Sequence, residues 1–143
     1  MSPLQLVIAG GIGIGSVLIG SSMAHVRGTL GEPTKRFRKT PNSPQLTDAY
    51  AQLGVHVYYD DADCVEFVES FAMEGVVHLL DGLSVFKTPV ATIVESVSKK
   101  AAVRSEEGGT SFVVPTLGLA FWRADGEATT FDSVAVAAPG YFA

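Results

Sequence analysis

The sequence predicts an α+β fold of two layers, in which tandem helix-plus-antiparallel-hairpin repeats form one continuous antiparallel sheet with two helices on one face. Two observations lead to this prediction. The apolar pattern of the first half recurs in the second, and in each half a segment of helical periodicity precedes two alternating segments. The 143 residues suit one domain, so we expect a single domain made of two repeats, about 1–72 and 73–143.

Three blocks of the first half match later blocks at shifts of 64, 67 and 66 residues. The pairs are Leu53–Tyr59 with Leu117–Arg123, Ile19–Val26 with Phe86–Ile93, and Val65–Val68 with Phe131–Val134. The match lies in the apolar pattern more than in residue identity, so it predicts architecture before chemistry. Three blocks in one order, at nearly one shift, indicate an internal duplication.

The N-terminal part of the chain predicts a strand, a turn and a helix. Leu4–Ala9 is expected to form a short strand, and the glycines of 10–15 favour turns. A helix follows, capped by Ser21 or Ser22 and ended by Gly31. Four residues fall at helical spacing along it: Met23, Val26, Arg27 and Leu30.

A basic cluster surrounds Phe37 after this helix: Lys35, Arg36, Arg38 and Lys39. Because Thr, Pro, Asn and Ser fill the neighbouring positions, we expect a solvated loop up to about Ser43. Leu53–Tyr59 then alternates as a strand, aspartates turn the chain, and Val65–Phe71 returns. These segments predict a β-hairpin.

The second half follows the same plan. Val76–Leu80 predicts a strand that ends in an Asp81-Gly82 turn. Thr88 is the expected cap of a second helix, with Pro89 at its first position, where the missing N–H has no cost. An apolar stripe then runs along this helix: Val90, Ile93, Val94 and Val97. Three further strands are expected, the last two as a hairpin: Ser111–Val114, Leu117–Arg123 and Thr130–Ala137.

Composition limits the partners and the compartment. The net charge of −5 disfavours a nucleic-acid partner, which needs a basic surface. A single cysteine, Cys64, favours a reducing compartment. The apolar segment 6–18 has no Lys or Arg before it, as a signal peptide would, and it is too short and too rich in glycine for a membrane helix. We therefore expect a cytoplasmic protein without a membrane partner.

No local enzyme or cofactor motif is complete. The glycine run lacks the last glycine of a dinucleotide-binding motif, because Ser16 stands there. The three histidines lack metal-ligand spacing, and the aspartates of 60–63 lack the glycine and distal glutamate of a calcium loop. Cys64 has no histidine beside it. We therefore predict no catalytic residues, no cofactor and no metal.

The alternation of the predicted strands indicates a binding face. Val55 and Val57 point to one side and His56 and Tyr58 to the other; in the second half, Leu119 and Phe121 oppose Ala120 and Trp122. The purely apolar pairs suit a helix-covered core, which leaves His56, Tyr58 and Trp122 on the open face. Such residues are typical of interface hot spots. The alternative is that Tyr141 and Phe142 fold over this face and form a second small core.

The segment from Ile19 to Pro33 resembles the opening motif of SmpA/OmlA-type outer-membrane lipoproteins. It shares the pattern Ile19-Gly20-Ser21-Ser22-Met23, then Val26, then Leu30-Gly31-Glu32-Pro33. The beta-lactamase inhibitor protein fold is similar and is built from two such units in tandem. This resemblance implies a tandem helix-plus-sheet fold with aromatic residues on an open sheet face that binds another protein.

Together these observations predict a non-enzymatic protein-binding module, in the manner of an inhibitor or an immunity-type protein. The expected partner-binding residues are His56, Tyr58, Trp122, Asp60, Asp61 and Asp63, the aspartates supplying a field complementary to a basic partner. The alternative is a small-ligand-binding or enzymatic domain with a pocket at the seam between the repeats. Pairing of edge strands leaves a homodimer open as well.

Overall fold

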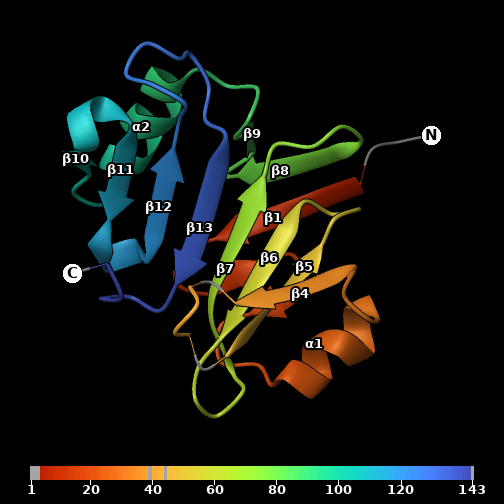
Figure 1. Ribbon diagram of the computed structural model, residues 1–143. Coiled ribbons are helices and arrows are strands. Elements are labelled where there is room, and N and C mark those ends of the chain that lie inside the picture. Colours follow the sequence, from red (N-terminus) through yellow and green to blue (C-terminus); the bar gives the residue numbers. More distant parts are fainter. Residues whose placement is uncertain (1–3, 39, 44, 143) are drawn as a thin grey trace.

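The computed structural model describes residues 4–38, 40–43 and 45–142, and its fold class is α+β, as predicted. An eight-stranded antiparallel sheet dominates the molecule, in the order β10-β11-β12-β13-β7-β6-β5-β4 (Figure 1). Its strands are β4 (Lys35–Arg38), β5 (Leu46–Tyr50), β6 (Val55–Tyr59), β7 (Val65–Phe71), β10 (Arg104–Glu106), β11 (Ser111–Val114), β12 (Leu119–Trp122) and β13 (Ser133–Ala137). The predicted hairpins are β6–β7 and β12–β13, and they meet where β7 pairs with β13.

A second, smaller sheet has the order β3-β2-β1-β8-β9. Its strands are β1 (Leu4–Ala9), β2 (Gly13–Ile14), β3 (Val17–Leu18), β8 (Val76–Leu80) and β9 (Leu83–Ser84). Strands β1 and β8 were expected in the single antiparallel sheet, and that expectation is wrong for both, because they pair in parallel here with Leu4 opposite Val76. Alternation identifies a strand but not its neighbour, and the long connection between β1 and β8 permits a parallel pair.

Helix α1 (Met23–Leu30) begins and ends where the sequence predicts. The Ser22 side chain caps it by accepting a hydrogen bond from the His25 N–H at 3.0 Å. Gly31 terminates it at φ 85°, a conformation that glycine adopts without strain, and donates its N–H to the Arg27 carbonyl.

Helix α2 (Val90–Ser98) buries the predicted stripe through Val90, Ile93 and Val97. The predicted cap is wrong, however. Pro89 is the N-cap at ψ 141°, and the Thr88 N–H donates to the Ser84 carbonyl at 2.9 Å. Thr88 therefore closes the preceding turn, and the helix starts one residue later than expected.

The basic cluster is not a loop over its described part. Lys35–Arg38 forms the edge strand β4, paired with β5, a strand that the sequence did not predict. A charged edge strand is a common protection against unwanted pairing. The Arg36 guanidinium also lies 3.3 Å from the buried Asp48 carboxylate of β5, which ties the edge to the core. Lys39 lies outside the described residues.

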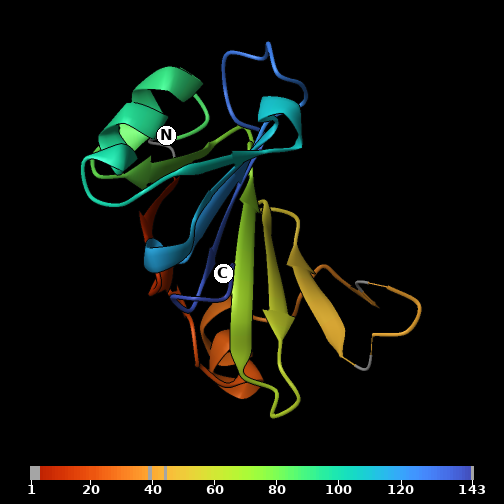
Figure 2. The same cartoon turned by 90° about the vertical axis from the view of Figure 1, so that its left-hand side faces the viewer.

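The core lies between the large sheet and the layer formed by the helices and the small sheet. In Figure 2, β1, β8 and α2 lie to the left of the large sheet. Val26 of α1 and Ile93 of α2 belong to the same buried cluster as Val57 and Phe121 of the large sheet. Both α-helices therefore pack on one face of the large sheet, and neither of them lies on the opposite face.

Candidate functional site

The pleat of β6 and β12 places the candidate residues as the alternation predicts. Val55 and Val57 are buried in the core, whereas His56 and Tyr58 are only partly buried on the other side of β6. In β12, Leu119 and Phe121 lie in the core, and Trp122 packs in a separate small cluster on the opposite face. We call this second side of the large sheet the open face.

A row of aromatic rings crosses the first-half strands of the open face. Phe37 of β4 meets His56 of β6 with 5.2 Å between ring centroids, and His56 meets Phe71 of β7 at 4.8 Å. His56 also lies 6.5 Å from Tyr58, which meets Phe67 of β7 at 5.1 Å. All four contacts are edge-to-face, the favoured geometry for aromatic pairs. We call these five residues the aromatic row.

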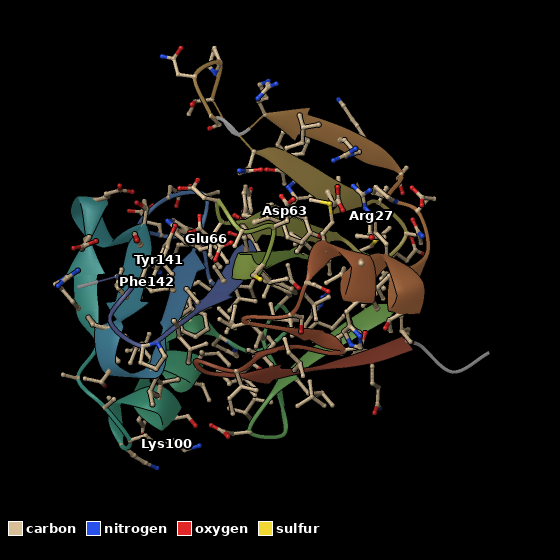
Figure 3. All side chains as sticks on the ribbon, turned by 90° about the horizontal axis from the view of Figure 1, so that it is seen from below. Arg27, Asp63, Glu66, Lys100, Tyr141 and Phe142 are labelled. Atoms are coloured by element: carbon tan, nitrogen blue, oxygen red, sulfur yellow. The ribbon has the colours of Figure 1, made fainter. Side chains whose placement is uncertain are left out.

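The C-terminal segment covers one end of this row. Tyr141 and Phe142 lie 5.6 and 5.9 Å from Phe67 and 5.2 Å from each other. The Arg104 guanidinium donates a hydrogen bond to the Phe142 carbonyl at 3.1 Å. In Figure 3 both rings lie beside Glu66, and burial together with the Glu66 charge raises the pKa of Tyr141.

This cover forms the second small core that the sequence left as an alternative. Phe67, Ala135 and Ala137 are its buried centre, and Tyr58, Trp122 and Phe142 pack around them. The alanines of β13 leave room for the large rings above them. Trp122 therefore serves this small core, and two strands, β13 and β7, separate its strand from β6 with His56 and Tyr58. The structure brings His56 and Tyr58 together, and Tyr58 also packs in the small core that holds Trp122.

The predicted aspartates occupy the turn between β6 and β7. The Asp60 carboxylate accepts hydrogen bonds from the N–H groups of Ala62 and Cys64 at 2.9 and 3.0 Å, which fixes the turn. Asp63 has φ 57°, and its carbonyl accepts the Met23 N–H at the start of α1. Asp60 and Asp63 thus hold the turn in place, while Asp61 is exposed.

A hollow of about 270 Å³ lies between this turn and the aromatic row. Tyr58, Asp60, Asp61 and Glu66 line it together with residues that lead into β5. Asp60 and Asp61 are therefore next to Tyr58, as a common binding surface requires. Asp63 is not among the residues that line the hollow.

Burial controls the protonation of the aromatic row. It lowers the pKa of His56 below its usual 6.5, so the ring is neutral at pH 7. The Tyr58 hydroxyl lies 3.4 Å from Glu69 Oε1, and burial together with that carboxylate raises the Tyr58 pKa. At neutral pH, His56 and Tyr58 thus present uncharged rings with polar edges.

Sequence reasoning missed a buried ionic cluster on the core side of the same strands. Asp48 is completely buried and accepts hydrogen bonds from Arg27 Nε and Nη2 at 3.0 and 2.9 Å and from the Tyr59 hydroxyl at 3.1 Å. The hydrogen bond to Asp48 raises the pKa of Arg27. One signal was available, because Arg27 shares the helical spacing of the apolar residues Met23, Val26 and Leu30. A cation in such a stripe needs a buried anion.

Phe37, Phe67 and Phe71 were also missed as members of the open face. Their contacts with β6 depend on how neighbouring strands are aligned. Phe67 of β7 lies opposite Tyr58 of β6, and Phe37 of β4 lies opposite Thr47 of β5. Within the described residues, no group of three or more histidine, cysteine or acidic side chains is placed to hold a metal ion.

Comparison with protein-family models, with curated proteins and with solved structures gave no match to this chain. The resemblance to SmpA/OmlA-type proteins therefore stays a prediction. No helix in the described part of the chain is long and apolar enough to cross a membrane.

Proposed function

We propose that this chain is a non-enzymatic protein-binding module, in the manner of an inhibitor or an immunity-type protein, which docks its partner on the open face. The aromatic row is the single observation that supports this most. It gathers rings from β4, β6 and β7, all partly exposed except that of Phe67, on a sheet face that no helix of the described residues covers. Aromatic anchors of this kind supply much of the binding energy at protein interfaces.

The chemistry around the row favours a protein with a basic contact surface. Tyr58 and His56 have polar groups at the edges of apolar rings. Such side chains suit a surface that is hydrated in the free protein and buried in the complex. Asp61 and Glu66 line the hollow beside Tyr58, and their carboxylates suit a lysine or arginine side chain of the partner. The predicted site is thereby refined to His56, Tyr58, Asp60 and Asp61, with Phe37 and Phe71 added.

We also infer that 1–72 and 73–143 are tandem structural repeats. In the large sheet, Val57 lies opposite Val68, and Phe121 lies opposite Val134. The sequence shifts of 64 and 66 residues carry the first pair onto the second, so residues that align in sequence also align as cross-strand partners. This agreement supports a duplication. Halves of an experimental structure that fail to superpose over these strands would contradict it.

The binding proposal is tested by capture and then by titration. Full-length protein is used to isolate a partner from a lysate of its source, and the purified pair is titrated by calorimetry. We expect the Phe37→Ala, Tyr58→Ala double variant to bind at least about 30-fold more weakly, since interface hot spots contribute about 2 kcal/mol or more.

Ile12→Ala is the matched control, because Ile12 is 60% exposed and lies next to β2 of the small sheet rather than on a strand of the large sheet. It should bind as the wild type does. If the double variant keeps its circular dichroism and melting temperature and also binds normally, the open face is not the interface.

A further inference from the structure

A second hollow, of about 520 Å³, lies where elements from both halves of the chain meet. Its wall includes Val7 of β1, Leu79 of β8 and Leu117, which are exposed or partly exposed. The core residues Ile8, Leu80, Val97 and Leu119 form its floor and are almost completely buried. We call it the seam pocket. Its volume falls in the range of small-molecule sites, and its lining is mainly aliphatic.

The seam pocket is remote from the open face. Figure 3 places Lys100, which lines the pocket, far from Glu66 and Tyr141. The pocket also lies on the side of the large sheet that carries the helices, since Val97 of α2 is part of its floor. A ligand here would therefore be distinct from the protein partner proposed above.

Two of the described residues that line the seam pocket are charged, and they pair with each other. Lys100 Nζ lies 2.7 Å from Asp81 Oδ2, and both side chains are about half exposed. An exposed ion pair contributes little to stability, so either group is available to another partner. The rest of the lining gives apolar contact only or backbone polar groups.

The two partners differ in mobility. Asp81 and Gly82 form the turn between β8 and β9, and both have positive φ, 51° and 82°, which identifies a type I′ hairpin turn. The backbone of Asp81 is therefore fixed by the turn, and its side chain is short. Lys100 follows the end of α2 and carries its ammonium on a flexible four-carbon chain, so it is the group that can turn to a ligand.

We propose that the seam pocket binds an apolar monocarboxylate, such as a medium-chain fatty acid. Its hydrocarbon chain packs against Val7, Leu79 and Leu117, and its carboxylate replaces Asp81 as the partner of Lys100. The ammonium thereby exchanges one carboxylate for another, and the apolar chain supplies the favourable free energy by leaving water.

Calorimetric titration of the full-length protein with decanoate tests this proposal. We expect saturable binding of one decanoate per chain and weaker binding of decanol, which lacks the charge. Lys100→Gln should weaken decanoate binding about tenfold, the effect of one charge-assisted hydrogen bond. Lys99→Gln, which removes the neighbouring lysine, should bind as the wild type does.

Asp81→Asn provides a second test, whose expected result could not be caused by loss of the fold. Asn-Gly favours the same type I′ turn as Asp-Gly, so the hairpin is retained while the competing carboxylate is removed. Decanoate should therefore bind this variant more tightly than the wild type. The proposal is overturned if decanoate fails to bind the wild type, if Lys100→Gln binds it equally well, or if decylamine binds in its place.

Discussion

His78 is a buried base whose ring nitrogens have no hydrogen-bond partner among the described residues. It lies in β8, is 1% exposed, and leaves both Nδ1 and Nε2 without a hydrogen bond there. Its ring meets Phe86 edge-on at 5.0 Å. Burial lowers the pKa of His78 to about 4, so the folded protein holds the ring neutral at pH 7.

This histidine should make the protein sensitive to mild acid. Between about pH 6.5 and 4 the unfolded chain binds a proton at His78 and the folded chain does not. The free energy of unfolding should therefore fall as the pH decreases through this window, by up to about 3 kcal/mol. Urea unfolding at pH 7.0 and 4.5 measures the loss.

His78→Leu should reduce that acid loss, because it removes the proton-binding group. His25→Gln is the control, since His25 is exposed on α1. If the free energy of unfolding of His78→Leu falls between pH 7.0 and 4.5 by as much as that of the wild type, other groups cause the loss.

Asp48 allows a prediction about charge burial. Asp48→Asn would leave the partly buried guanidinium of Arg27 without its carboxylate. Removing one partner of a buried pair costs about 3–5 kcal/mol, whereas an exposed pair contributes about 1 kcal/mol or less. The urea midpoint of Asp48→Asn should thus fall much further than that of Asp81→Asn. Equal midpoints would mean that the Asp48 cluster does not stabilise the fold.

At the scale of elements, two glycine substitutions should act in opposite directions. Gly28 lies inside α1, and a Cβ there meets no atom within 4 Å, so Gly28→Ala should stabilise the protein by about 0.5–1 kcal/mol. Gly118 has φ 59°, and a Cβ there would clash with the Ala137 carbonyl. Gly118→Ala should therefore lower the melting temperature, while Gly28→Ala raises it. The same sign for both variants would refute this assignment.

The sequence predicted those elements whose pattern is strong and local. Strands β1, β8 and β11 have the predicted bounds, as does α1, because alternation, caps and glycine stops act within a few residues. Strand β5 was missed because Thr47 and Asp48 interrupt its apolar pattern, and both are buried by tertiary contacts. The parallel pairing of β1 with β8 was missed because no local pattern specifies a strand's neighbour.

The candidate site shows the same difference between what a local pattern predicts and what depends on tertiary contacts. Alternation placed His56 and Tyr58 on the correct face, since that depends on one strand alone. Their aromatic neighbours come from other strands, and the sequence alone did not specify this register. Trp122 was placed on the correct face too, but its packing into a small core depends on where the C-terminal segment folds.

At the scale of the whole molecule, the C-terminal rings should act as a removable cover. Trp122 is the only tryptophan of the chain, and it packs in the same small core as Phe142. A Tyr141→Ala, Phe142→Ala double variant should shift the Trp122 fluorescence to longer wavelength and increase binding of an apolar dye. Leu18→Ala, which alters an exposed residue of the small sheet, is the control. An unchanged spectrum in the double variant would mean that the rings do not shield Trp122.

The parallel pair of β1 and β8 also determines the order in which the chain can fold. During synthesis β1 emerges well before β8, so its parallel neighbour is not available until residue 80 has left the ribosome. The first half therefore waits for the second before its small sheet is complete, and non-local pairing of this kind slows folding. A chain that reads as two units in sequence is thus expected to fold as one cooperative unit.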